Sequence, residues 1–200
     1  LVQHHHAHMA ACLVENGHEG TVLGIILDGT GLGSDRNIWG GEFLLGDISS
    51  FTRVGHFREA PLPGGDRAVL EPWRFALALM EKALGPGDAE RLAGEIWPTH
   101  SHLFGSILST LDKAPVTLLR KLFDAVAAVL GIRDVISYEG QAAMELESSA
   151  RGGSRPAPFG IREQNGKMIL DWEPAVRWIL LEGLRLGAAR TSSAFHFGLA

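Results

Sequence analysis

Apolar and polar residues along this chain repeat with two different periods, and each period predicts a different kind of element. In residues 5–16, apolar side chains recur at i, i+3, i+4 and i+7, which is the spacing of an amphipathic helix. Residues 21–27 (TVLGIIL) form a continuous apolar run, typical of a strand that is buried on both faces. Two further strands are predicted at residues 38–45 and 51–57, so the chain opens with a mixed α/β layer.

After residue 66 the pattern is mainly helical. Helices are predicted at about residues 68–84, 88–96, 102–112, 117–130, 140–150, 174–187 and 189–199. Residues 161–172 interrupt this series as a β-hairpin, because Asn165-Gly166 between two strand-like runs is a strong turn signal. The sequence therefore divides into an α/β part over residues 1–66 and a largely helical part over residues 67–200.

Composition and charge narrow the class of protein. The formal net charge is −5 and no basic stripe stands out, so no nucleic-acid partner is expected. Cys12 is the only cysteine, which excludes an internal disulfide and a cysteine-based zinc site and favours a cytoplasmic setting. We expect Cys12 in the core, on the buried side of the first helix. No run reaches the roughly 18 apolar residues of a membrane-spanning helix, so no membrane is implied.

The densest candidate chemistry is Val-Gln-His-His-His-Ala-His over residues 2–8. His4 and His8 are four residues apart, so a helix would place both rings on one face, where they can share a divalent metal. Asp28 follows the first predicted strand and is the natural third ligand, since open α/β sheets bind ligands at the carboxyl ends of strands. Two histidines and one aspartate suit both zinc and iron. A solvated surface run or a purification-tag remnant is the alternative.

Asp28 also opens a glycine-rich loop, Gly29-Thr30-Gly31-Leu32-Gly33. Such a loop lets backbone N–H groups approach phosphate oxygens, and an ordinary β-turn is the alternative. The loop lacks the Lys-Ser/Thr of a P-loop, and no helix follows it directly. Actin-like and sugar-kinase-like folds instead bind nucleotide phosphates with a strand, an Asp-Gly-Thr-Gly turn and further strands, and this is the order found here.

Three further positions can be interpreted from their context, two of them in two ways. Gly140 precedes a predicted helix whose backbone amides could face an anion or could simply be capped. Glu42, beside two glycines in a predicted strand, could bind a ligand or be an edge carboxylate. Asp124 lies in a predicted helix and is interpreted as a residue of its polar face.

Longer motifs follow one another over most of the chain. They are Val-Gln-His-His-His-Ala-His (2–8), Asp-Gly-Thr-Gly-Leu-Gly-Ser-Asp (28–35), Ile-Trp-Gly-Gly-Glu-Phe (38–43), Leu-Pro-Gly-Gly-Asp (62–66), Leu-Phe-Asp-Ala-Val-Ala-Ala-Val-Leu-Gly (122–131), Tyr-Glu-Gly-Gln-Ala-Ala-Met-Glu-Leu-Glu (138–147) and Phe195-His196. In this order they resemble the HypF-type carbamoyltransferases of NiFe-hydrogenase maturation.

The resemblance implies a two-lobed, actin-like and sugar-kinase-like (ASKHA) α/β fold, of which this chain is a part of the TsaD-like carbamoyl transfer module. It implies that a YrdC-like domain makes carbamoyl adenylate from carbamoyl phosphate and ATP. The module then passes the carbamoyl group to the C-terminal cysteine of the partner HypE. Carried onto this sequence, the metal ligands are His4, His8 and Asp28, the nucleotide or carbamoyl contacts are Gly29, Thr30, Gly31 and Gly140, and the catalytic residues are His5 and Asp28.

Two features depart from the family pattern. Before Leu122 the family usually reads Ser-Ser-x-Gly-Arg, whereas residues 117–121 here read Thr-Leu-Leu-Arg-Lys. The family's later Ser-Gly-Gly-Val-Phe-Gln-Asn region and its late acidic metal ligand are not found, so we expect a fragment of a longer protein. The alternative functions are carbamoylation of a small-molecule hydroxyl and a non-catalytic metal- and nucleotide-binding scaffold.

Overall fold

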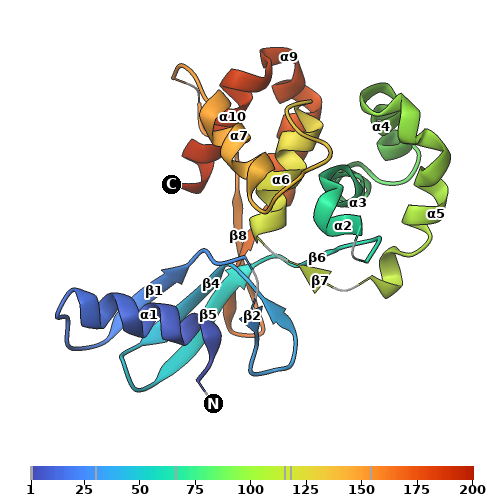
Figure 1. Cartoon of the computed structure of the whole chain (residues 1–200). Coiled ribbons are helices and arrows are strands. Elements are labelled where there is room, and N and C mark those ends of the chain that lie inside the picture. Colours follow the sequence, from blue (N-terminus) through green and yellow to red (C-terminus); the bar gives the residue numbers. More distant parts are fainter. Residues whose placement is uncertain (1, 30, 66, 115, 118, 154) are drawn as a thin grey trace. The chain divides into compact units, whose positions relative to one another are not determined.

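The computed structural model describes residues 2–29, 31–65, 67–114, 116–117, 119–153 and 155–200, without the side chains of residues 116, 117, 119 and 120. The chain divides into two compact units (Figure 1). Unit 1 comprises Leu1–Glu59, Val116–Arg120 and Ile161–Asp171, and unit 2 comprises Ala60–Pro115, Lys121–Gly160 and Trp172–Ala200. The division into an α/β part (residues 1–66) and a mainly helical part (residues 67–200) remains a prediction.

Unit 1 is built on a five-stranded mixed sheet with the order β1-β4-β5-β9-β8. The strands are β1 (Val22–Ile26), β4 (Glu42–Gly46), β5 (Phe51–Phe57), β9 (Lys167–Asp171) and β8 (Gly160–Gln164). β1, β4 and β5 pair antiparallel, and β5 pairs parallel with β9. The helix α1 (His4–Glu15) lies across this sheet (Figure 1), and β2 (Gly31–Leu32) and β3 (Ile38–Trp39) form a separate ribbon.

The predicted hairpin is confirmed as β8 and β9. Its two turn residues, Asn165 and Gly166, have φ angles of 53° and 72°. Positive φ at both central positions is what a two-residue turn between twisted strands requires, and Asn-Gly adopts it readily.

The single strand expected at residues 38–45 is wrong, because Gly40 and Gly41 divide it into β3 and β4. Gly41 has a φ angle of 87°, a conformation that leaves the extended strand geometry. A Cβ atom at residue 40 would lie 2.7 Å from the carbonyl oxygen of Gly29. Gly40 therefore lets the backbone pass close to the loop that follows β1.

The expectation that the first strand is buried on both faces is also wrong. β1 lies at the edge of the sheet, and Leu23 and Ile25 are 52% and 60% exposed, whereas Ile26 is 7% exposed. Ile26 joins the core with Met9 and Leu13 of α1, so one face of the strand is covered by the helix.

Cys12 of α1 is exposed, which corrects the expectation of a core position. It lines a groove of 570 Å³ between α1 and β1 together with Met9, His8 and Asp28. The helix thus presents Leu13 and Met9 to the core while Cys12 faces outward.

Unit 2 is largely helical, as the sequence predicts. Its elements are β6 (Ala60–Pro61), α2 (Arg67–Leu70), α3 (Pro72–Leu84), α4 (Asp88–Ile96), the 3-10 turns η1 (Pro98–Leu103) and η2 (Leu111–Lys113), α5 (Phe104–Leu108), α7 (Gln141–Ser149), α8 (Glu173–Trp178), the π-helical turn η3 (Ile179–Gly183), α9 (Leu184–Leu186) and α10 (Ala188–Leu199). β7 (Val116–Thr117) and the start of α6 (Leu119–Val129) fall in unit 1, and the rest of α6 falls in unit 2.

α3 is the central helix of unit 2, since it is buried on nearly every side. Its large side chains Trp73, Leu77 and Met80 are almost fully buried, which is typical of a helix enclosed by other helices. Three predicted helices are interrupted. Pro72 begins a new helix instead of continuing α2, and residues 102–112 contain the short α5 between two 3-10 turns. The predicted helix at residues 174–187 is divided into α8 and α9 by the π-helical turn η3. No helix among the described residues has the length and apolar character needed to cross a membrane.

Candidate metal and phosphate site

The first turn of α1 carries the candidate metal ligands. Gln3 is the N-cap, and its side-chain oxygen accepts a hydrogen bond from the backbone N–H of His6 at 2.8 Å. This cap starts the helix at His4, so His4 and His8 lie one turn apart on one face. Their ring centroids are 4.7 Å apart.

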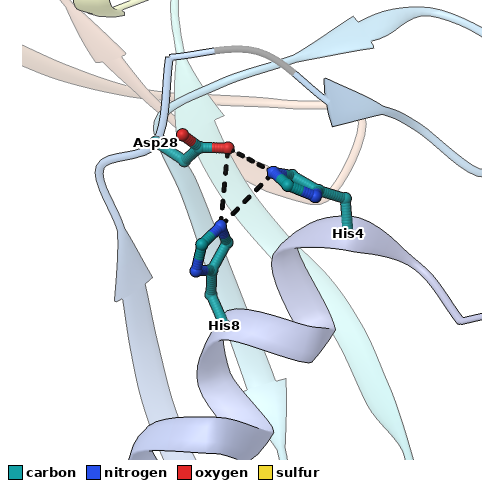
Figure 2. Close-up of side chains that lie close together, drawn as sticks. All are labelled: His4, His8 and Asp28. Atoms are coloured by element: carbon teal, nitrogen blue, oxygen red, sulfur yellow. Dashed lines mark hydrogen bonds and ion pairs between the residues drawn. The ribbon is translucent and has the colours of Figure 1, made fainter.

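Asp28 closes the cluster from the end of β1. Its Oδ2 lies 2.6 Å from His4 Nε2 and 3.7 Å from His8 Nε2, and the two Nε2 atoms are 3.3 Å apart. Figure 2 shows the two rings of α1 and the carboxylate pointing toward one another. The sequence predicted this trio from one helix spacing and one strand end, and the structure brings the three side chains together.

The three ligand atoms fit a small divalent ion. An ion that binds nitrogen and oxygen at about 2.0–2.1 Å in tetrahedral geometry separates its ligands by about 3.3 Å. The observed separations of 2.6, 3.3 and 3.7 Å lie on both sides of that value. Three protein ligands with partly exposed side chains leave a coordination position for another group, which is typical of catalytic zinc sites.

Asp28 is held in the charged form that a metal ligand needs. Its partial burial works to raise the pKa, but hydrogen bonds from the backbone N–H of Gly29 and from His4 outweigh this, and the pKa lies below its ordinary value. The Gly29 N–H lies 2.7 Å from Asp28 Oδ1. One carboxylate oxygen is thus oriented by the backbone while the other faces the histidines.

The glycine loop packs directly against the histidine rings. A Cβ atom at residue 31 would lie 2.6 Å from His4 Cδ2 and 2.8 Å from His5 Cε1, so only glycine fits there without movement of a ring. Gly31 pairs with Trp39 in the β2–β3 ribbon. Thr30 lies outside the described residues. The phosphate-binding role expected for Gly29, Thr30 and Gly31 remains a prediction.

The two remaining histidines of the motif are buried, and they differ in their partners. His6 Nε2 lies 2.8 Å from the backbone oxygen of Asp47, and its ring packs on Phe51 at 4.7 Å, so His6 holds α1 to the β4–β5 turn. His5 contacts Gln3, and its Nε2 has no hydrogen-bond partner among the described residues. Burial lowers the pKa of His5, which favours the neutral ring.

A buried ion pair, Glu42 with Arg53, stabilises the segment after the glycine loop. Arg53 was not identified from the sequence. Glu42 is fully buried, pairs with Arg53 Nε at 2.5 Å and accepts the Gly40 N–H at 3.0 Å. The Arg53 guanidinium lies 4.2 Å from the Trp39 ring centroid, and Trp39 Nε1 donates to Asp35 at 2.9 Å. The interpretation of Glu42 as an edge carboxylate is wrong, because Glu42 is fully buried on β4, which lies between β1 and β5 in the sheet. Its contacts indicate a structural role, and the ligand-binding interpretation remains a prediction.

Gly140 and Asp124 lie in unit 2. Gly140 is the N-cap of α7 with a φ angle of 83°, which a glycine adopts easily. Asp124 is 1% exposed, so its interpretation as a polar-face residue is wrong. Its Oδ2 pairs with Lys121 Nζ at 3.1 Å, and its Oδ1 has no partner among the described residues. The expected nucleotide contact at Gly140 remains a prediction.

Comparison with known proteins decides the family. Residues 24–200 match the family described as "Carbamoyltransferase, Kae1-like Domain, second subdomain". The chain belongs to this family. Asp28 and the glycine loop lie inside the matched residues, and the histidines of α1 precede them.

Individual HypF proteins extend the similarity over nearly the whole chain. The chain is 40% identical to the carbamoyltransferase HypF of Rhizobium leguminosarum bv. viciae over 198 residues, which is 98% of this chain and 25% of that protein. It is 50% identical to the HypF of Rhodobacter capsulatus over 155 residues, 74% of this chain and 20% of that protein. These two HypF proteins are thus four to five times as long as the part that the chain covers.

A solved structure described as full-length HypF in the phosphate- and nucleotide-bound form matches the fold with a TM-score of 0.86. The match has 34% sequence identity and covers 98% of this chain and 26% of that chain. The resemblance to HypF and the Kae1-like (ASKHA) α/β fold are therefore confirmed, and this chain is a partial Kae1-like segment of HypF type.

Proposed function

We propose that this chain is the part of a HypF-type protein that transfers a carbamoyl group from carbamoyl adenylate to the C-terminal cysteine of HypE. The observation that carries the proposal is the cluster of His4, His8 and Asp28 beside a glycine loop, in a chain of the HypF family. Binding of phosphate and nucleotide by a HypF of the same fold supports the nucleotide part of this proposal.

In this proposal His4, His8 and Asp28 hold a zinc or iron ion, which would supply Lewis-acid polarisation of the carbonyl group in the mixed anhydride. Gly29 keeps the Asp28 carboxylate oriented toward the two imidazoles. The proposal assigns the nucleotide and carbamoyl contacts of the glycine loop to Gly29, Thr30 and Gly31, because backbone N–H groups of such loops bind phosphate oxygens.

The remaining parts of the reaction belong to other segments and proteins. A YrdC-like domain of the full protein makes carbamoyl adenylate from carbamoyl phosphate and ATP. HypE supplies the attacking thiol, which agrees with the absence of a proposed nucleophile among the residues around the cluster. The lone cysteine, Cys12, lines the adjacent groove on α1 and takes no part in this scheme.

Transfer to the acceptor cysteine tests the proposal. The full-length protein that carries this module is incubated with carbamoyl phosphate, ATP and HypE, and mass spectrometry locates the carbamoyl group. We expect a thiocarboxamide on the C-terminal cysteine, lost in His4→Ala and His8→Ala and retained in the control His18→Ala, an exposed histidine outside the cluster. Full transfer by a variant that has lost its metal would rule out a catalytic role of the metal, and no transfer by the unsubstituted protein would overturn the proposal.

A further inference from the structure

His5 combines complete burial with an unpaired nitrogen. Its side chain is fully enclosed, and Nε2 has no hydrogen-bond partner among the described residues. Buried polar atoms in folded proteins are nearly always paired, because an unpaired one loses its hydration without compensation. An exception beside a candidate metal cluster calls for a partner that the described residues do not supply.

Gln3 determines whether that nitrogen donates or accepts. The Gln3 side-chain oxygen accepts the backbone N–H of His6 at 2.8 Å, which fixes the orientation of the amide. The amide nitrogen therefore faces His5 Nδ1, at 3.1 Å. An amide nitrogen can only donate, so Nδ1 accepts and the ring proton resides on Nε2. The unpaired atom is a hydrogen-bond donor.

The position of the ring places this donor at the glycine loop. Cε1, the carbon between the two ring nitrogens, would lie 2.8 Å from a Cβ atom at residue 31, and His4 Cδ2 would lie 2.6 Å from the same atom. The His4 and His5 ring centroids are 5.3 Å apart. The donor of His5 therefore borders the backbone of Gly31 and the ring of a candidate metal ligand.

We propose that His5 Nε2–H donates a hydrogen bond to the carbonyl oxygen of the carbamoyl group during transfer, and that Gln3 is the positioning residue that keeps the proton on Nε2. This inference rests on the proposed function. It assigns His5 the role of a neutral donor, which neither gains nor loses a proton in the reaction.

The transfer step shows where such a donor acts. The acceptor thiol loses its proton to solvent, and its sulfur forms a bond to the carbonyl carbon, which places negative charge on the carbonyl oxygen. The C–O bond to the adenylate phosphate then breaks, and AMP leaves with the bonding electron pair. A fixed N–H donor beside the developing oxyanion stabilises this intermediate more than the substrate, so its removal lowers kcat more than it raises KM.

Two substitutions of equal length separate the donor from the bulk of the ring. In His5→Gln the amide N–H reaches about the place of Nε2, whereas His5→Met fills the same space without a donor. In the transfer assay with the full-length protein, we expect His5→Met to lower kcat about a hundredfold with metal content and KM little changed. His5→Gln should keep most of the activity. Equal losses in the two variants, or no loss in His5→Met, would overturn the role.

A second measurement tests the tautomer without reference to activity. Two-bond ¹H–¹⁵N correlation spectra show which nitrogen of His5 carries the proton. We expect Nε2 in the unsubstituted protein, and a loss of this preference together with a lower kcat in Gln3→Met. A proton on Nδ1 in the unsubstituted protein with normal transfer overturns the role of His5 alone, whereas absence of transfer overturns the proposed function itself.

Discussion

At the level of single residues, Gly31 sets how closely the loop after β1 approaches the histidines of α1. Its Cα faces the rings of His4 and His5, and any side chain there would overlap both. Asp28, three residues earlier in the chain, contacts His4 and His8. The geometry of the cluster therefore depends on a position that supplies no ligand atom.

Substitution of Gly31 by alanine should weaken metal binding. The new methyl group must displace the His4 ring, and misplacement of a ligand by its surroundings typically costs about 10–100-fold in metal affinity. Isothermal titration with Zn²⁺ measures the change. Gly94→Ala is the control, because nothing lies within 4 Å of a Cβ atom there, and the extra methyl group in α4 should raise stability by about 0.5–1 kcal/mol. Unchanged affinity in Gly31→Ala would contradict the packing described here.

The candidate ligands illustrate what single residues in a sequence can predict. The spacing of His4 and His8 is a local property of one helix, so it fixes their common face before any fold is known. Asp28 could be added because it ends a strand. The roles of His5, Glu42 and Arg53 could not be predicted in this way, because they depend on contacts between segments that no local period records, such as those of His5 with the glycine loop and of Glu42 with Arg53.

At the level of elements, β1 shows that an apolar composition alone does not determine how many faces of a strand are buried. Its run of apolar residues is what a central strand contains, yet it has one neighbour, β4, and one covered face. The alternation is visible only in the structure, where Ile26 packs toward α1 and Ile25 faces outward. A Cβ atom at Gly24 would lie 2.6 Å from Met9 Sδ, so the small residue allows the helix to sit close on the strand.

Adjacent isoleucines of β1 should respond very differently to the same change. Ile26→Thr removes buried apolar contact and places a hydroxyl in the core, so we expect a loss of about 2–4 kcal/mol in the free energy of unfolding. Ile25→Thr keeps a β-branched side chain at an exposed site and should change it by about 0.5 kcal/mol or less. Urea denaturation measures both. A large loss at Ile25 would mean that its face is covered in the folded protein.

The pair of Glu42 and Arg53 should contribute strongly to the stability of unit 1. Both side chains are buried, so Glu42→Gln leaves the arginine with only the more distant and partly exposed Asp35 carboxylate, 3.7 Å away, and we expect a loss of about 3 kcal/mol in the free energy of unfolding. Glu95→Gln is the matched control, because its pair with Arg91 is exposed and should be worth about 0.5 kcal/mol or less. Similar small effects of the two substitutions, measured by urea denaturation, would contradict a structural role for Glu42.

At the level of the whole molecule, unit 1 is assembled from distant parts of the chain. The sheet gains β9 and β8 from residues 160–171, and β5 pairs parallel with β9 through Gly55 and Met168. The Asn-Gly turn predicted the hairpin itself, because that signal is local. The strand that pairs with the hairpin could not be predicted. β5 and β9 lie more than 100 residues apart in the sequence, and no local pattern indicates that they pair.

The fold class was predictable for a different reason. Seven motifs in a fixed order resembled one family, and the matched family and the solved HypF structure agree with that resemblance. The order of the motifs predicts the fold class even where the apolar periodicity of a single segment predicts its element wrongly. The divided strand at Gly40 and the exposed Cys12 show that this agreement does not extend to every residue.

Metal binding by the N-terminal cluster is the measurement that tests the account most directly. The metal-free protein is titrated with Zn²⁺ and, under reducing conditions, with Fe²⁺, in parallel with His4→Ala, His8→Ala, Asp28→Asn and the control His18→Ala. We expect a single divalent ion per chain, bound by the unsubstituted protein and the control and lost or greatly weakened in the three cluster variants. Absence of binding, or binding that survives all three substitutions, would contradict the assignment of this site.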